Sequence, residues 1–330
     1  MVKHPFVTVQ LKSYLSGIDQ NFDPENINDS LIIASNDVRQ VLPVALYNKL
    51  IDSITTPPQN DADNFKEAVE LLRYSMAPLA FYRAFIWLQI RVSNNSVTTY
   101  KSSDEVTAFK YQVDEAKENL LLRYAAFMKE LIDFLNENIE IFTDWKDSVQ
   151  QKALDELLIK DYRDFDNYFL TDGDASFFYR ARVIMQEVQD EDLVPLVGDI
   201  GKILKPVDPN NPANTLAPNF QKIKQLKKAL AYLTISRVLY DWDDFYLPAT
   251  LRRMLGQSKS SGSGSTLGKS SSHDSDKERL SLKYRNKGLT ILGSIDVQQQ
   301  ADKAENDFPN DPINISSPDI NNSDKHYYMT

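Results

Sequence analysis

The feature that most constrains the fold is a run of apolar residues three and four positions apart, the periodicity of one face of an α-helix. The longest run follows Ser102 and Glu105, which have the spacing of a capping box at a helix start. Its apolar positions are Val106, Phe109, Val113, Ala116, Leu120, Phe127, Leu131 and Phe134. The same spacing recurs along most of the chain, so the sequence predicts an all-α fold.

Glycine is scarce in the part of the chain that carries this periodicity. Only four of the ten glycines precede residue 256: Gly17, Gly173, Gly198 and Gly201. A fold rich in β-sheet needs many tight turns, and a phosphate-cradling loop needs several glycines close together. Both are therefore disfavoured.

Proline and capping residues place the first helices. Asp23 is a suitable cap and Pro24 suits the first helical position, so we expect a helix from there to about Val41. Pro43 should interrupt the helical structure because it lacks an amide donor. A second helix should then run to about Ile54.

An internal repeat is the second constraint. At an offset of 147 residues, three apolar positions of the segment 30–50 fall on apolar positions of the segment 176–204: Ala34 on Ala181, Val38 on Met185 and Val41 on Val188. At an offset of 154 residues the matches are Leu46 with Ile200, Leu50 with Leu204, Val69 with Ile223, Leu72 with Leu226, Met76 with Leu230, Ala77 with Ala231, Leu79 with Leu233, Phe81 with Ile235, Arg83 with Arg237 and Phe85 with Leu239. The change of offset indicates a short insertion around residues 190–192. The alternative is chance, because any two amphipathic helices can be placed in apolar register.

The repeat predicts three parts in the chain. Residues 1–143 form a first helical bundle that includes a long connecting helix, and residues 144–255 form its duplicate. Residues 256–330 form a Ser/Gly-rich linker and a flexible, mostly disordered tail, because this composition cannot bury a core. Within the tail, the short apolar run Leu289–Ile295 is expected to form a strand or a docking segment.

The charge is acidic and unevenly placed. The 330 residues carry a net charge of −10, and residues 1–255 hold 28 basic and 37 acidic side chains. Nucleic-acid binding needs clustered Lys and Arg, so we expect no sequence-specific nucleic-acid partner. The first residues lack a signal-peptide pattern and no segment has the 18 or so apolar residues of a membrane span, so we expect no membrane partner either.

The residue types of common catalytic sites are missing from the predicted bundles. The only histidines are His4, His273 and His326, near the N-terminus or in the tail, and the chain has no cysteine. A histidine base, a Ser-His-Asp triad and a structural zinc site are therefore not expected. The sequence predicts a protein that is not an enzyme and needs no cofactor.

One acidic group leaves an alternative open. Asp241, Asp243 and Asp244 follow an apolar helix and could bind Mg²⁺ in a helical enzyme, although no second aspartate-rich motif matches them. A solvated acidic helix end is the simpler interpretation. A deep polar cavity between the halves that gathers ionisable groups would count against a purely structural role.

The segment QLKSYLSGIDQNFDPENINDSLIIASNDVRQVLPVALYNKLID resembles the helical head-tail connector, or adaptor, proteins of tailed bacteriophages. With NENIEIFTDWKDS and the second copy from SFFYRAR to VPLVGDIGKIL, about residues 10–250 resemble an uncharacterised family of Bacteroidota phages and prophages. The two copies and the long tail depart from the short connectors.

The resemblance implies a structural virion protein, made in the bacterial host cytoplasm and placed between portal and tail. It implies a homo-oligomeric ring whose neighbours are the portal and tail-completion proteins. The alternative is a non-catalytic helical scaffold or interaction module of a phage operon.

Several large apolar residues are candidates for contacts between subunits, with core burial as the alternative for the first three. They are Phe81, Tyr82, Trp87 and Trp242, together with Leu289, Ile291 and Ile295 of the tail.

Overall fold

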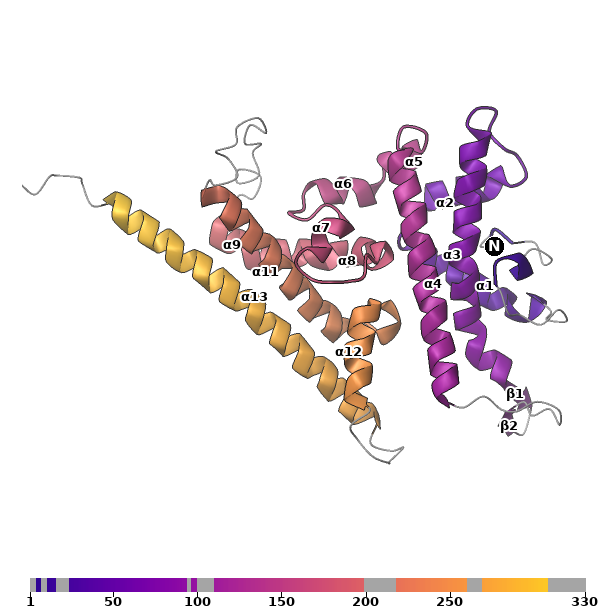
Figure 1. The fold of residues 1–330 in the computed structure, drawn as a ribbon. Coiled ribbons are helices and arrows are strands. Elements are labelled where there is room, and N and C mark those ends of the chain that lie inside the picture. Colours follow the sequence, from indigo (N-terminus) through magenta and orange to yellow (C-terminus); the bar gives the residue numbers. More distant parts are fainter. Residues whose placement is uncertain are drawn as a thin grey trace, which may run out of the picture.

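The computed structural model describes residues 4–6, 11–15, 24–93, 96–99, 110–198, 218–259 and 269–307. The described chain is predominantly helical, as the sequence predicts. Its one small sheet is an antiparallel hairpin of β1 (Ile90–Ser93) and β2 (Ser96–Thr99). The helices follow one another across an elongated body, with the N-terminal helices at one end and α13 at the other (Figure 1).

The first half of the molecule, residues 4–137, is built around two long helices. Its elements are η1 (Leu11–Ser13), η2 (Pro24–Ile27), α1 (Asn28–Arg39), α2 (Val44–Ser53), α3 (Ala62–Gln89) and α4 (Lys110–Glu137). α3 and α4 lie side by side and antiparallel, and α1 and α2 pack against α3 (Figure 1). The break at Pro43 between α1 and α2 is where the sequence predicts it.

The second half, residues 143–307, begins with short helices and ends with two long ones. Its described elements are α5 (Thr143–Lys146), α6 (Val149–Asp155), α7 (Tyr162–Asp166), α8 (Ala175–Val188), the π-helix η3 (Gln189–Leu193), α9 (Val194–Val197), α11 (Pro218–Asp241), η5 (Asp244–Tyr246), α12 (Ala249–Lys259) and α13 (Lys269–Asp307). α11 and α13 form a second antiparallel pair, and α8 packs against α11.

Local capping fixes the start of α8. Asp172 and Gly173 have positive φ angles of 59° and 69°, so the chain turns sharply there. The Asp174 carboxylate then accepts a hydrogen bond of 2.9 Å from the Phe177 amide, which satisfies a free donor of the first helical turn. The sequence DGDASF therefore works as a turn and a cap.

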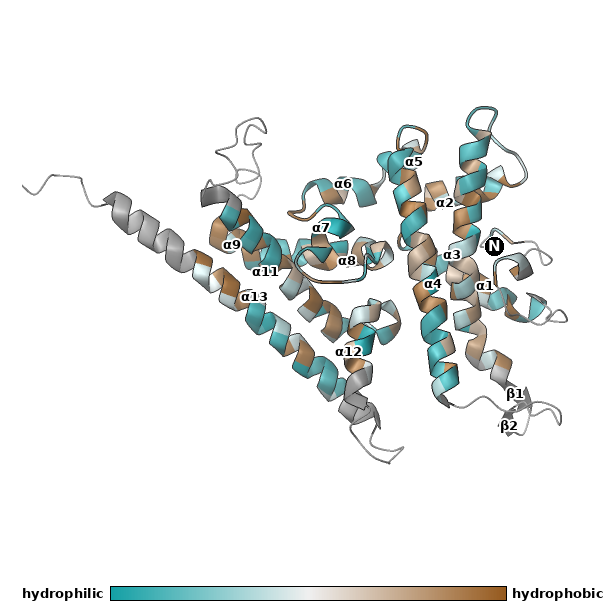
Figure 2. Ribbon diagram, viewed as in Figure 1, coloured by the Kyte–Doolittle hydropathy of each residue, from teal (hydrophilic) through white to brown (hydrophobic). Residues whose placement is uncertain are grey.

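The hydrophobic core extends through both halves without a break. Figure 2 shows hydrophobic bands that recur along the long helices. α4 has cover on two sides: its Phe127 ring stacks on Tyr74 of α3, with 5.0 Å between centroids, and its Tyr124 hydroxyl accepts a hydrogen bond of 3.1 Å from Arg180 of α8. α4 is therefore the element that joins the two halves.

The prediction of a linker and disordered tail over residues 256–330 is wrong for part of this range. Residues 256–259 complete α12, and residues 269–307 form α13. Apolar residues recur along α13 at helical spacing, and Tyr284, Leu292 and Ile295 are buried. The composition of α13 is mostly polar, but the helix has a narrow apolar stripe, and α11 covers it. Residues 260–268 and 308–330 lie outside the described residues.

Residues that the repeat matches have similar burial in the two halves, where the structure describes both. Ala34, Val38 and Val41 of the first half are fully buried, and so are Ala181, Met185 and Val188 of the second. At the offset of 154, every described member of the matched apolar pairs is buried or partly buried. Ile200 and Leu204 lie outside the described residues. The duplication itself stays a prediction, although the two halves repeat the same order of packed helices.

Close packing of α13 on α11 gives a test of the corrected fold. A Cβ atom added at Gly288 would lie 2.6 Å from Cγ of Leu233, which is too close for two carbon atoms. We expect Gly288→Ala to lower the free energy of unfolding by about 1–3 kcal/mol, as overpacking does. Urea unfolding followed by circular dichroism measures this change.

Gly293 provides the matched control because it lies in the same helix and an added Cβ would meet nothing within 4 Å. Gly293→Ala should be neutral or raise stability by up to about 1 kcal/mol, since alanine favours the helix over glycine. Equal effects of the two substitutions would contradict the packing of α13 on α11.

Candidate functional site

The junction between the halves contains a buried carboxylate. Asp37, at the end of α1, is 4% exposed, and its Oδ2 accepts hydrogen bonds from Arg83 Nε at 2.9 Å and Nη2 at 2.7 Å. Burial alone would lower the pKa of Arg83, but the charge and hydrogen bonds of Asp37 raise this pKa above its usual value. The Arg83 guanidinium is therefore well satisfied by hydrogen bonds to Asp37.

A loop of the second half covers this ion pair. The Arg83 guanidinium lies 3.7 Å from the centroid of the Phe245 ring, and the Tyr82 ring stacks on Phe245 at 5.2 Å. The Tyr246 hydroxyl donates to Asp37 Oδ1 at 3.2 Å. Residues more than 160 positions apart in the sequence are thus held in one polar and aromatic cluster.

Arg180 of α8 completes the contact from the second half. Its Nη2 donates to the Asp37 backbone oxygen at 3.0 Å and to the Tyr124 hydroxyl at 3.1 Å. Its guanidinium also lies 4.9 Å from the Tyr246 ring centroid. Arg180 is therefore held in place by neutral acceptors and an aromatic face.

A cavity of about 550 Å³ opens beside this cluster, between the two halves. Its charged lining residues are Arg39, Arg180, Arg182, Asp241 and Asp243. Trp242, Tyr246 and Val183 supply apolar surface. A polar cavity between the halves counts against a purely structural role. The residues that line it therefore decide whether the molecule can also bind a ligand or catalyse a reaction.

The three arginines of the cavity have no carboxylate partner within ion-pair distance among the described residues. Arg182 donates to the Tyr179 backbone oxygen, and burial lowers the pKa of Arg182 from its usual value. Arginine nevertheless remains charged at neutral pH because its pKa is so high. The described lining includes no histidine, and no serine or threonine beside a base. The arrangement suits binding of a negative group better than acid-base catalysis.

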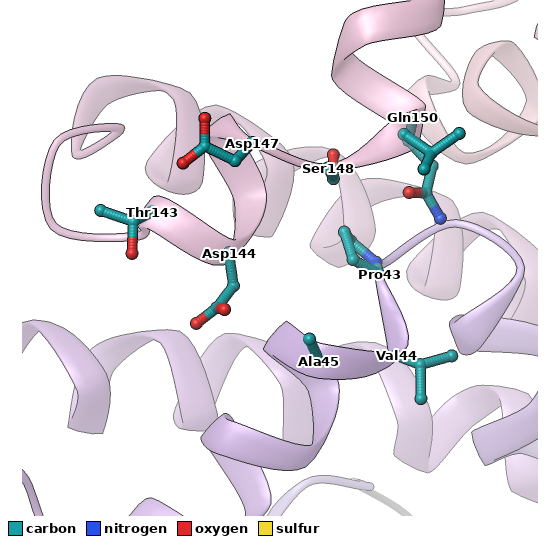
Figure 3. A pocket seen from close by; sticks show the side chains of 9 residues that line it. Pro43, Val44, Ala45, Thr143, Asp144, Asp147, Ser148 and Gln150 are labelled. Atoms are coloured by element: carbon teal, nitrogen blue, oxygen red, sulfur yellow. The ribbon is translucent and has the colours of Figure 1, made fainter.

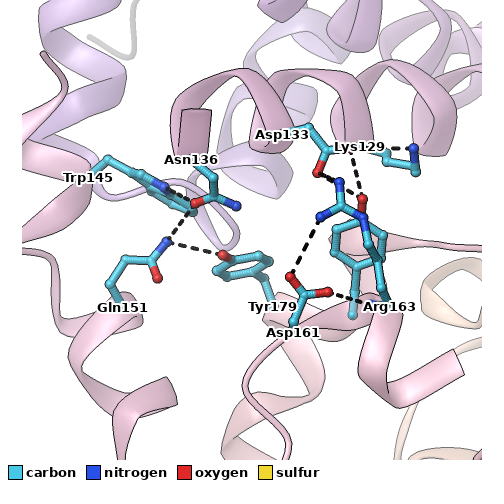
Figure 4. Close-up of polar contacts among 9 residues, drawn as sticks. Lys129, Asp133, Asn136, Trp145, Gln151, Asp161, Arg163 and Tyr179 are labelled. Carbon is cyan, nitrogen blue, oxygen red and sulfur yellow. Dashed lines mark hydrogen bonds and ion pairs between the residues drawn. The ribbon is translucent and has the colours of Figure 1, made fainter. Parts of the chain in front are cut away.

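A second polar network fixes α4 to α5, α6 and α8 (Figure 4). Asn136 Oδ1 accepts a hydrogen bond of 2.8 Å from the indole of Trp145, and Gln151 reaches both Asn136 and the Tyr179 hydroxyl, at 3.4 and 3.1 Å. Burial raises the pKa of Tyr179 to about 12, so this hydroxyl stays protonated.

A separate set of polar contacts around Asp133 ties α4 to α7. Asp133 accepts hydrogen bonds of 2.8 Å from the Tyr162 hydroxyl and forms ion pairs with Arg163 at 2.8 Å and Lys129 at 3.4 Å (Figure 4). Burial, together with the acceptor Asp133, raises the pKa of Tyr162. Every group in this network has a partner, so its role is to hold the halves together.

A further cavity of about 430 Å³ lies where α2 begins, opposite α5 and α6 (Figure 3). Its ionisable lining residues are Asp144 and Asp147, and Asp144 already pairs with Lys49 at 3.0 Å. The lining offers no arrangement of a nucleophile with a base. It is a less promising site than the arginine cavity.

The aromatic residues proposed for subunit contacts lie in different environments. Phe81 packs partly buried against the core, and Tyr82 is covered by Phe245. Trp242 contacts Phe177 edge to face at 5.8 Å and lines the arginine cavity. Trp87 is 63% exposed at the end of α3 and is the one of these four with a largely free side chain.

The three candidates of the tail lie on α13, in a helix rather than a strand. Ile295 is buried and Ile291 is partly buried against the core. Leu289 is 44% exposed. The run therefore docks within the chain through its isoleucines, and Leu289 alone of the three remains on the surface.

The aspartates considered for Mg²⁺ do not converge. Asp244 pairs with Lys277 at 3.6 Å, whereas Asp241 and Asp243 line the arginine cavity. In the described ranges, no group of three or more His, Cys, Asp or Glu side chains is placed to hold a metal ion. None of the described helices combines the length and apolar character needed to cross a bilayer.

Sequence reasoning missed the residues that build the junction. Asp37, Arg39, Arg180 and Arg182 belong to no motif, and they come together only because α1 and α8 meet. Arg83 was singled out as a repeat match, and its ion pair explains why the position is polar within an apolar helix.

Comparison with known proteins gives one match. Residues 38–154 match the model of a family of unknown function (DUF6712), a range that runs from α1 to α6. No curated protein and no solved structure matches the chain. The match covers α2–α4, α5 and most of α6, and carries no activity with it.

The buried ion pair gives the prediction for this site. Asp37→Ala should lower the free energy of unfolding by about 3 kcal/mol or more, because it leaves Arg83 without its carboxylate partner in a largely buried place. Asp144→Ala removes a carboxylate from a solvent-exposed pair and should cost less than about 1 kcal/mol. Urea unfolding compares the two, and similar losses would show that Asp37 does not organise the junction.

Proposed function

We propose that the chain is a structural assembly protein of a phage or prophage, a head-tail connector subunit that forms a ring of identical copies in the virion. The observation that carries the proposal is a surface on the second half. It corresponds, in the repeat, to the surface of the first half that the second half covers. The resemblance to connector proteins supplies the biological setting, with portal and tail-completion proteins as neighbours.

The proposal takes the two halves as copies of one unit. Arg83 of α3 pairs with Asp37 at 2.7 Å, and Arg237, its match at an offset of 154, pairs with Glu191 at 2.7 Å and Asp192 at 2.9 Å. Glu191 and Asp192 lie in η3, in the short insertion that directly follows α8. In each half, the arginine at the matched position thus pairs with a carboxylate at or just after the C-terminal end of α1 or α8, which supports a common origin.

The contact between the halves uses two different surfaces. α4 of the first half packs against α8 of the second. In the repeat, α13 of the second half corresponds to α4, and α1 of the first half corresponds to α8. α13 and α1 lie at opposite ends of the molecule (Figure 1). A contact between unlike surfaces does not close on itself, so repeating it adds further copies until a ring or a filament forms.

The second half keeps exposed apolar side chains on the surface that would receive the next copy, although Ser236 itself is buried against Ser281 of α13. In the first half, Phe245 covers Tyr82 and Arg83. Their counterparts at an offset of 154, Ser236 and Arg237, line a groove of about 300 Å³ between α11 and α13. The same groove is lined by three exposed apolar side chains: Tyr240, Leu282 and Leu289.

The first half offers the complementary surface. Arg180 contacts α4 across the junction, and its counterpart at an offset of 147 is Ile33 of α1, which is 45% exposed. Trp87, 63% exposed, lies near the C-terminal end of α3, just before β1. These side chains would be covered when the next copy docks. The acidic charge of residues 1–255 would let DNA pass through a ring without adhering.

Light scattering and negative-stain electron microscopy of the purified protein test this function. We expect closed rings or higher oligomers, and Leu282→Glu with Leu289→Glu should reduce them to monomers because two charges would be buried in the contact. Ile33→Glu should do the same from the other surface. A wild-type protein that stays monomeric at all concentrations would support the interaction-module alternative instead.

Mixing the two variants separates this geometry from general loss of stability. Each variant retains one intact surface, so an equimolar mixture should form dimers and nothing larger. Leu170→Glu is the control, because Leu170 is 59% exposed, lies between α7 and α8 and does not line the groove, and it should leave the oligomers intact. A mixture that stays monomeric would contradict the pairing of these two surfaces.

A further inference from the structure

We propose that the arginine cavity between the halves binds an anion with two or more carboxylate or phosphate groups. The inference rests on the charges around the cavity and is independent of the assembly proposed above.

The charges of the cavity are unbalanced in an otherwise acidic molecule. Arg39, Arg180 and Arg182 line it and have no carboxylate within ion-pair distance among the described residues. The chain carries 47 acidic against 37 basic side chains, so a shortage of carboxylates does not explain the missing partners. Partly buried guanidinium groups are costly to keep together unless a negative charge lies between them.

The hydrogen-bond pattern of the arginines also leaves capacity for a ligand. Arg180 and Arg182 donate to backbone oxygens and a tyrosine hydroxyl, all of them neutral. The Nε atoms of Arg39 and Arg180 are enclosed without a partner, so a ligand in the cavity would be held by the outer nitrogens of these guanidinium groups. An anion in the cavity would supply the charged acceptor that these groups lack, and guanidinium groups pair with carboxylate and phosphate in a bidentate manner.

The rest of the lining restricts the ligand. A cavity of about 550 Å³ holds a molecule with several groups rather than a single small ion. Asp241 and Asp243 also face the cavity and would repel an anion that fills it completely. The negative groups of the ligand should therefore lie toward the arginines, with its uncharged part against Trp242.

Isothermal titration of the full-length protein with pyrophosphate and with citrate at low ionic strength tests this site. We expect one probe or both to bind, and the tighter of the two identifies phosphate or carboxylate as the preferred group. Arg182→Gln should weaken binding about tenfold, as loss of one charged hydrogen bond does. Asp243→Asn should tighten it, because it removes a repelling charge at an exposed position. A gain in affinity cannot arise from misfolding.

Arg279→Gln is the matched control, since it removes the same charge from an exposed position on α13 outside the cavity lining. It should leave the affinity within a factor of two. Absence of binding of both probes at millimolar concentration would overturn the proposal. Equal weakening by Arg182→Gln and Arg279→Gln would also overturn it, because the anion would then respond only to overall charge.

Discussion

The whole molecule depends on one constraint, which is that α4 needs cover on two sides. Its aromatic and aliphatic side chains pack on α3 in one direction and on α8 in the other. Apolar surface left in water on either side would remove a large part of the free energy that stabilises the fold. The two halves therefore behave as one body, and the polar groups at their junction can be positioned accurately.

Buried polar groups give this junction its specificity. Apolar helices tolerate small changes in register, whereas the Asp37 carboxylate is satisfied only when Arg83 and Tyr246 arrive together. The same contact that aligns the halves brings Arg180 and Arg182 to the edge of a cavity. The contact that joins the halves thus also forms a cavity that can bind an anion. Assembly and ligand binding are therefore compatible in one molecule.

The sequence predicts the positions of the helices better than the contacts between them. The break at Pro43 follows from residue chemistry within a few positions, and it is present. α13 was missed because its apolar stripe is narrow and its ends are polar, so composition outweighed periodicity. The arginine cavity could not be predicted at all, since Arg39 and Arg180 meet only through tertiary packing.

Cysteine cross-linking tests the central claim most directly, because the native chain contains no cysteine. A variant with both Ile33→Cys and Leu282→Cys, treated with a short bis-maleimide, should give a ladder of covalent oligomers on a denaturing gel. Either single variant should give no ladder, and a mixture of the two should give covalent dimers only. A double variant that remains monomeric, or a single variant that cross-links to itself, would contradict a head-to-tail contact between unlike surfaces.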